Sequence, residues 1–292
     1  MKQSFLGKRI VFILLLYYSA LSSQKLTIIN NQTESITIKN SKEEVIIKGG
    51  NKREFSNVVN RVSINGTQDL DRLLTLYLEP NEKLIITVQK DNKITYTGDQ
   101  ANVNEYLNEK LNVDTFGKMK DYLKASEKKN LGSLKITSEL FLADVLKKVN
   151  LSSIVSSSED SDLTKKIKNH IKYNWLYTVF SAIISLKDKN FTSQVITYYY
   201  KKYIDSDITQ YSCNGVFPYN VMVILVKNKD AVPAQFPIYP IVEPTDSDSI
   251  NQYLPRSCQK FYFLEKYRYL NHINDPKKDY YEKVLNEKFN DQ

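Results

Sequence analysis

The sequence contains few of the residues from which catalytic and cofactor sites are usually built. Its 292 residues include two histidines, two cysteines and eight glycines. No HExxH, GxSxG or P-loop pattern occurs, so the common zinc-peptidase, serine-hydrolase and nucleotide-binding sites have no template here. The sequence therefore predicts a protein with no catalytic residues, no cofactor-binding residues, no cofactor and no metal ligands.

Long apolar runs are also missing. The longest, Ile10 to Tyr18, would cover only about 14 Å as a helix, whereas a bilayer core is ~30 Å thick. Basic residues precede this run between Lys2 and Arg9, and the small residues of Ala20–Ser22 follow it. This order is typical of a secretory signal peptide. We expect residues 1–22 to be a signal peptide cleaved near Ser22, and the mature chain to be periplasmic or secreted, with no transmembrane segment.

The chain also lacks a strong charge of either sign. The formal net charge is +8, and it falls to +5 when the three basic residues of the leader are removed, because 38 basic and 33 acidic residues remain. Lysines alternate with glutamates and aspartates along the chain, which is typical of a solvated surface. We expect no nucleic-acid partner, and instead an envelope protein, a peptide or a glycan.

The two cysteines, Cys213 and Cys258, lie 45 residues apart. In an oxidising compartment an even pair favours a structural disulfide. Two separate buried thiols are the alternative, because the sequence does not show whether the two residues are close in space.

The first part of the chain follows a β pattern. From Lys25 to about Gly98, alternate residues are apolar in short runs such as Leu84–Val88, and Asn- and Gly-rich turns separate the runs. Short strands without intervening helices predict an antiparallel β-sandwich or small barrel over residues 23–98.

After Asp99 the apolar residues recur with helical spacing, as they do every four residues from Ile167 to Ile183. Residues 99–292 are therefore expected to form a mainly α-helical domain, and the chain an α+β protein. Six of the eight prolines lie between Pro218 and Pro255, which predicts an irregular Pro-rich insertion at about 211–256. Within it, the apolar run Val221–Val226 fits a strand or a helix fragment equally well.

The junction of the two patterns reads ITYTGDQANVNEYL, residues 94–107. Gly98 would relax the backbone where the last strand ends, and Asp99 would serve as a helix N-cap or a turn residue. We expect Asn104, Tyr106 and Leu107 to dock the first helix against the sandwich. The junction is thus interpreted as a structural contact and not as an active site.

Two further features leave alternatives open. The 21 tyrosines are bunched at Tyr198–Tyr200, Tyr262–Tyr269 and Tyr280–Tyr281, and they could form a stacking surface or fill a helical core. Ser-x-x-Lys spacings occur at Ser126–Lys129 and Ser257–Lys260, but such matches are expected by chance in a chain rich in both residues.

Residues 77–111 resemble the region that precedes the thioredoxin domain in exported TlpA-type thiol–disulfide oxidoreductases. The matching elements are Leu78-Glu79-Pro80-Asn81-Glu82, then Thr97-Gly98-Asp99, then Asn104-Glu105-Tyr106-Leu107. The resemblance implies an accessory region of β-sandwich and helices. Cys213 is followed by Asn-Gly-Val, so the Cys-x-x-Cys of the thioredoxin domain is missing and redox activity is not carried over.

These observations predict an exported, non-catalytic binding or envelope-assembly module. The alternatives are an uncharacterised envelope hydrolase and, third, a thiol-redox accessory protein.

Overall fold

The computed structural model describes residues 24–40, 43–56, 61–66, 70–79, 81–111, 120–149, 160–213, 215–231 and 236–289. The predicted signal peptide lies outside these residues. The described residues form two compact units, one ending at Leu111 and one beginning at Lys120. The first unit is mainly β and the second is helical, which confirms the α+β class.

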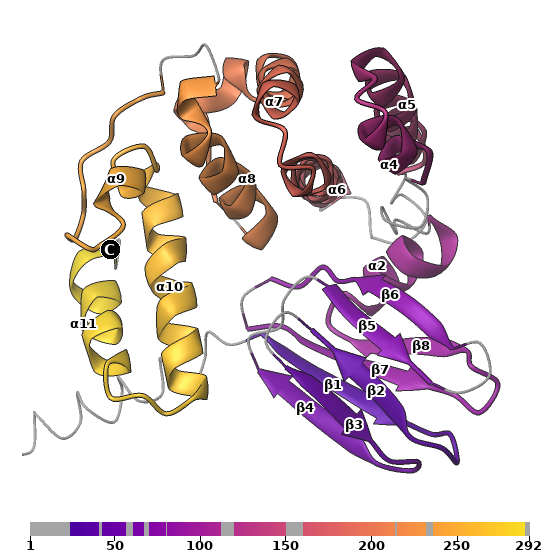
Figure 1. Cartoon of the computed structure of the whole chain (residues 1–292). Coiled ribbons are helices and arrows are strands. Elements are labelled where there is room, and N and C mark those ends of the chain that lie inside the picture. The colour runs from indigo at the N-terminus through magenta and orange to yellow at the C-terminus, as the bar shows by residue number, and fades with distance from the viewer. Residues whose placement is uncertain are drawn as a thin grey trace, which may run out of the picture. The chain divides into compact units, whose positions relative to one another are not determined.

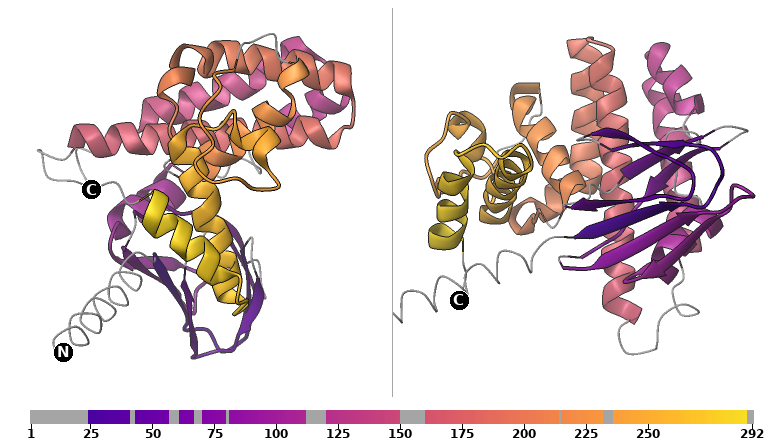
Figure 2. Two further views of the ribbon diagram at one scale, coloured as in Figure 1. Left: turned by 90° about the vertical axis from the view of Figure 1, so that its left-hand side faces the viewer. Right: turned by 90° about the horizontal axis from the view of Figure 1, so that it is seen from below.

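The first unit is a sandwich of two four-stranded sheets that face each other (Figures 1 and 2). One sheet has the order β4-β1-β7-β8 and the other β3-β2-β5-β6. The strands are β1 (Lys25–Asn30), β2 (Ile36–Lys39), β3 (Glu44–Ile47), β4 (Lys52–Ser56), β5 (Arg61–Asn65), β6 (Asp71–Thr75), β7 (Lys83–Val88) and β8 (Ile94–Gly98).

A single apolar core lies between the sheets. Alternate residues are buried along the strands, as in β1 and β7, because successive side chains of a strand point to opposite faces. Both sheets contribute to the core; Ile28 and Ile86 come from one and Ile38 and Ile64 from the other. The two-sheet form of the sandwich is therefore the one that the chain adopts.

The sequence predicts a purely antiparallel sandwich, but one pair of its strands is parallel. β1 pairs with β7 in parallel over six positions, from Lys25 opposite Lys83 to Asn30 opposite Val88. The pairs β1–β4 and β7–β8, and those of the second sheet, are antiparallel. A parallel pair needs a long crossover, and the strands β2 to β6 between β1 and β7 supply it.

A short helix completes the first unit. α2 (Ala101–Glu105) continues directly into one turn of π-helix, η1 (Tyr106–Lys110). The boundary expected after Gly98 therefore falls inside this unit, which extends to Leu111 among the described residues.

The second unit is built around α6, whose Trp175, Val179 and Ile183 are fully buried. α10 and α11 lie side by side and enclose a small cluster of Phe263, Val284 and Phe289 (Figure 1). The helices are α4 (Lys120–Glu127), α5 (Leu131–Lys148), α6 (Asp160–Ser185), α7 (Lys189–Tyr203), η2 (Asp205–Gln210), α8 (Val216–Lys227), η3 (Lys229–Ala231), α9 (Asp248–Asn251), α10 (Arg256–His272) and α11 (Lys278–Lys288).

The irregular Pro-rich insertion is narrower than the predicted 211–256. Helix α8 begins at Val216, and Val221–Val226 belongs to it. Pro218 falls in the first turn of α8. Backbone N–H groups there have no intrahelical acceptor, so proline costs the helix no hydrogen bond. The described segment without helix or strand begins at Phe236, and it bends at Val242 and Glu243. Within the ranges given above, no helix has both the length and the apolarity needed to cross a membrane.

Candidate functional site

Gly98 and Asp99 hold the end of β8 against β7. Gly98 has a φ of 95°, and a Cβ there would lie 2.5 Å from the carbonyl oxygen of Lys83. The Asp99 carboxylate accepts a hydrogen bond from the Lys83 N–H at 2.8 Å. Helix α2 begins two residues later, at Ala101, and its N-cap is Gln100. Of the two predicted alternatives, Asp99 is therefore the turn residue and not the N-cap.

Asn104 and Asn108 bind the edge of the sheet through their side-chain amides. Asn104 accepts from the Tyr77 N–H and donates to the Tyr77 carbonyl, both at 2.9 Å. Asn108 makes the same pair of bonds to Thr75, at 2.9 and 3.0 Å. Four helical residues rise about 6 Å and two strand residues about 6.6 Å, so the two spacings match.

The other residues of the junction complete this contact. Leu107 is fully buried between the two asparagines, whereas Tyr106 is only partly buried. The amides occupy backbone groups that the edge strand β6 would otherwise expose to another chain. The junction is therefore a structural contact. The sequence analysis predicted Asn104 and missed Asn108.

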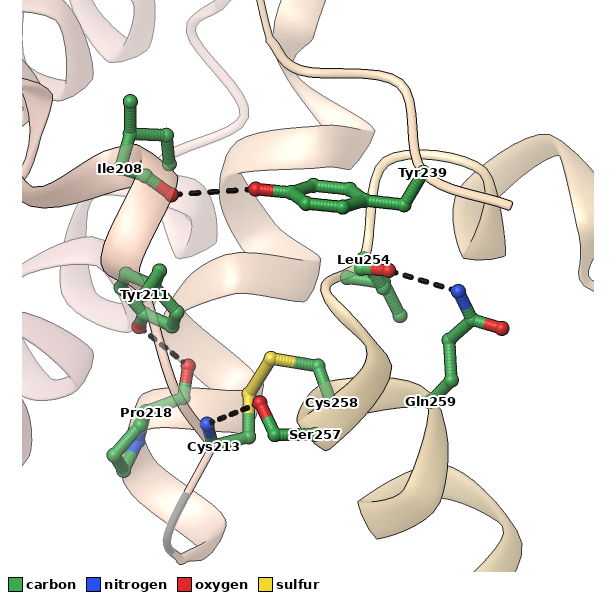
Figure 3. Close-up of a disulfide and its surroundings, with 9 residues drawn as sticks. All are labelled: Ile208, Tyr211, Cys213, Pro218, Tyr239, Leu254, Ser257, Cys258 and Gln259. Carbon is green, nitrogen blue, oxygen red and sulfur yellow. Dashed lines mark hydrogen bonds between the residues drawn. A yellow bond between two sulfur atoms is a disulfide. The ribbon is translucent and has the colours of Figure 1, made fainter. Parts of the chain in front are cut away.

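Cys213 and Cys258 form a disulfide with a Cα–Cα distance of 4.8 Å (Figure 3). It joins the segment before α8 to the first turn of α10. Beside it, the Cys213 N–H donates to the Ser257 hydroxyl at 3.2 Å. The Tyr211 hydroxyl donates to the Pro218 carbonyl at 2.7 Å. The predicted Cys213–Cys258 disulfide is thus confirmed, and the alternative of two separate thiols is wrong.

The Ser-x-x-Lys pairs have their functional groups engaged elsewhere. The Ser126 hydroxyl donates to the Tyr122 carbonyl, and the Lys129 ammonium lies 2.5 Å from the Asp188 carboxylate. The Lys260 ammonium donates to a main-chain carbonyl near the end of α11. Across the described residues, no three potential metal-ligating side chains gather in one place.

The first tyrosine bunch fills the core. Tyr199 and Tyr200 are at most 1% exposed. The Tyr199 hydroxyl lies 2.6 Å from that of Ser138, and its ring packs edge-on against Trp175. Burial raises the pKa of Tyr199 well above its ordinary value. In the C-terminal bunch, by contrast, Tyr269 is 55% exposed.

Segment 236–244, which we call the strap, runs beside α9 in the second unit without helix or strand and bends at Val242 and Glu243 (Figure 1). Every third side chain faces inward. Phe236 packs against the ring of Tyr200, and Val242 packs on the α10–α11 cluster. Between them, the Tyr239 hydroxyl donates to the Ile208 carbonyl (Figure 3). The strap is thus anchored at three points along its length.

Gln259 fixes the backbone of the strap. This residue of α10 is 1% exposed. Its amide nitrogen donates to the carbonyls of Pro240 and Leu254, at 3.0 and 2.9 Å, and its oxygen accepts from the Val242 N–H at 2.9 Å. The neighbouring Cys258 is joined to Cys213, so the helix turn that carries Gln259 is itself covalently held.

The outward side of the strap exposes two large apolar side chains. Ile238 is 74% exposed and Ile241 is 38% exposed. The chain from 232 to 255 contains three acidic residues and no basic one, although the protein as a whole is basic. Adjoining exposed apolar side chains with an acidic flank are an arrangement suited to binding.

The sequence analysis predicted irregular structure here but missed the strap. The available signal was the three-residue repeat in FPIYPIVEP, which places proline at 237 and 240 and isoleucine at 238 and 241. A period of three is that of a polyproline-type extended chain.

No protein-family model and no curated protein matches the chain. Among solved structures, the N-terminal domain of AlgF from P. aeruginosa is 14% identical, and the match covers 26% of this chain and 93% of that chain. The TM-score is 0.22. A likeness of this size carries no argument about fold or function.

Proposed function

We propose that the chain is an exported, non-catalytic module that binds a partner protein through its helical unit. One observation carries the proposal: a rigidly anchored strap exposes 74% of Ile238 and 38% of Ile241. Single exposed apolar side chains are common on protein surfaces, but Ile238 and Ile241 lie three residues apart on one anchored segment, and adjoining exposed apolar side chains are what mark interaction sites.

The anchoring of the strap supports a role in binding. A loop that orders only when it binds loses conformational entropy at that moment, which weakens the complex. Here Gln259, Tyr239 and the disulfide already fix the backbone in the unbound chain. The conformational entropy of the strap is therefore lost when the chain folds, and binding does not have to supply it again.

The chemistry of the strap favours one of the expected partner classes. Glycans are bound by aromatic stacking and polar side chains, whereas aliphatic side chains such as Ile238 and Ile241 bury well only against apolar protein surface. We therefore propose a protein partner. The order of basic, apolar and small residues in 1–22 supports export, and an exported chain would meet this partner in the cell envelope or outside the cell.

Site-specific photo-crosslinking in the native host tests the proposal. A benzophenone side chain replaces one exposed apolar residue at a time: Ile238 in the strap, Ile136 on α5, or Ile46 on β3. We expect an adduct of one discrete mass with an envelope protein from position 238. Absence of an adduct from all three positions would argue against a binding function.

Export is tested on the same material by determining the N-terminus of the recovered protein. We expect the mature chain to begin close to residue 23. A chain that keeps Met1 in its native host would contradict export.

A further inference from the structure

We infer that the strap itself is a preorganised ligand, which lies in an aromatic-lined groove of the partner protein that binds extended proline-type segments. This inference rests on the proposed binding function and names the partner's chemistry. It is carried by the spacing, the hydrogen-bonding state and the charge of the strap.

The spacing of the strap residues fits this mode of recognition. Phe236, Tyr239 and Val242 face inward, while Ile238 and Ile241 face outward, so both sets repeat every three residues. A polyproline-type chain has three residues per turn and therefore presents one ridge of side chains along its length. Domains that bind such chains receive the ridge between flat aromatic side chains.

The backbone of the strap is unsuited to the main alternative, in which an extended segment adds a strand to a partner's sheet. Pro237, Pro240 and Pro244 have no N–H to donate. The N–H of Tyr239 is bonded to a carbonyl just after α9, and that of Val242 to Gln259. Strand addition uses alternate N–H groups along one edge, and these residues interrupt both edges of the strap, so recognition through side chains is favoured.

The charge of the region adds a requirement on the partner. Glu243 lies near the C-terminal end of the strap and Asp246 two residues beyond that end, and the sequence has no basic residue between 232 and 255. The Glu243 carboxylate accepts a hydrogen bond from the Tyr280 hydroxyl at 3.2 Å. A groove that receives this segment is expected to place Lys or Arg beside its end, because opposite charges raise the association rate and fix the direction of binding.

The test uses the full chain with a benzophenone side chain in place of Ile238, cross-linked in envelope extracts of its native host. Two synthetic competitors are added to envelope extracts: the nonapeptide FPIYPIVEP, and the same peptide with Pro237 and Pro240 replaced by alanine. We expect the proline-containing peptide to reduce the adduct at least tenfold, and the alanine peptide to need several times the concentration for the same effect. The cross-link should map beside Trp, Tyr or Phe of the partner.

Other outcomes overturn the inference. Equal competition by the two peptides would show that the extended proline conformation is not recognised. An adduct with a second copy of this chain or with lipid would identify a different occupant. If position 238 gives no adduct while position 136 does, the strap inference fails and the proposed binding through the helical unit stands. An adduct from position 46 alone would contradict both. If no position gives an adduct, both fail.

Discussion

At the scale of single residues, buried amides hold the first unit together where helix meets sheet. Asn104 is fully buried, and its amide satisfies both backbone groups of Tyr77. A buried polar group stabilises a fold only when it is fully hydrogen-bonded. The Asn104 amide and the Tyr77 backbone groups therefore each need the other as a hydrogen-bond partner.

Replacing Asn104 with alanine should leave the buried N–H and C=O of Tyr77 without these bonds. Each unmade bond costs about 1–3 kcal/mol, so we expect the free energy of unfolding of the first unit to fall by roughly 2–6 kcal/mol. Asn102→Ala is the matched control, because Asn102 is exposed on the same helix. It should change stability by less than about 0.5 kcal/mol. Urea denaturation of both variants measures the difference, and equal effects would contradict the account.

Asp188 links the second unit's stability to pH. Its carboxylate accepts from the Lys129 ammonium and caps α7 through the Phe191 N–H. The hydrogen bond from Lys129 holds the pKa of Asp188 below its ordinary value. The folded state therefore favours the charged form, and its stabilisation is present above the unfolded pKa of about 3.9 and lost as pH falls through the lower folded value.

We therefore expect Asp188→Asn, which can still cap the helix, to be less stable than the wild type at pH 7. The difference should shrink as the pH falls below about 4. Lys129→Gln should show the same dependence, because it removes the same ion pair. Thermal denaturation from pH 7 to pH 3 measures this, and a difference that stays constant over the range would refute the assignment.

At the scale of elements, the disulfide supports the strap by holding the start of α10 in place. Cys213 and Cys258 close a loop of 45 residues that contains α8, the strap and α9. The bond limits the conformations open to the unfolded chain, and the beginning of α10 is held where Gln259 can bind the strap.

Replacing both cysteines with alanine should lower the free energy of unfolding by up to about 4 kcal/mol, the chain-entropy value for a loop of this length. Urea denaturation of the wild type with and without reductant should show the same loss. The double variant is its own control, because reductant should not change it further. If reduction leaves the wild-type stability unchanged, the disulfide does not stabilise the unit.

What the sequence could predict at this scale follows from how local each signal is. The strands were predictable because alternation is a property of consecutive residues such as Leu84, Ile86 and Val88. The parallel pairing of β1 with β7 was not, because it depends on residues more than fifty positions apart. For the strap, the sequence predicted only irregular structure. Its backbone is fixed by hydrogen bonds to Gln259, a distant residue that nothing in the sequence of the strap identifies as a partner.

At the scale of the whole molecule, the two units have separate cores. The core of the first unit draws on residues 26–96, with Leu107 and Asn108 of the following helix also buried. Residues 24–111 therefore contain all the core contacts described for this unit.

We expect a fragment of residues 24–111 to fold by itself, with a single cooperative unfolding transition and dispersed amide resonances. A shorter fragment that ends at Gly98 should be much less stable, because it lacks Asn104, Leu107 and Asn108. Calorimetry and NMR of the two fragments make the comparison. Equal stability of the two fragments would show that the helix is not part of the folding unit.

The central claim is that the chain works by binding a partner protein through the strap. The most direct measurement is the dissociation constant between the full chain and the partner recovered by cross-linking, compared for the wild type, Ile238→Ser with Ile241→Ser, and Ile46→Ser. Ile46 is 68% exposed in the other unit and serves as the matched control. The account predicts at least tenfold weaker binding for the strap variant and unchanged binding for the control. Equal binding by all three proteins would contradict it.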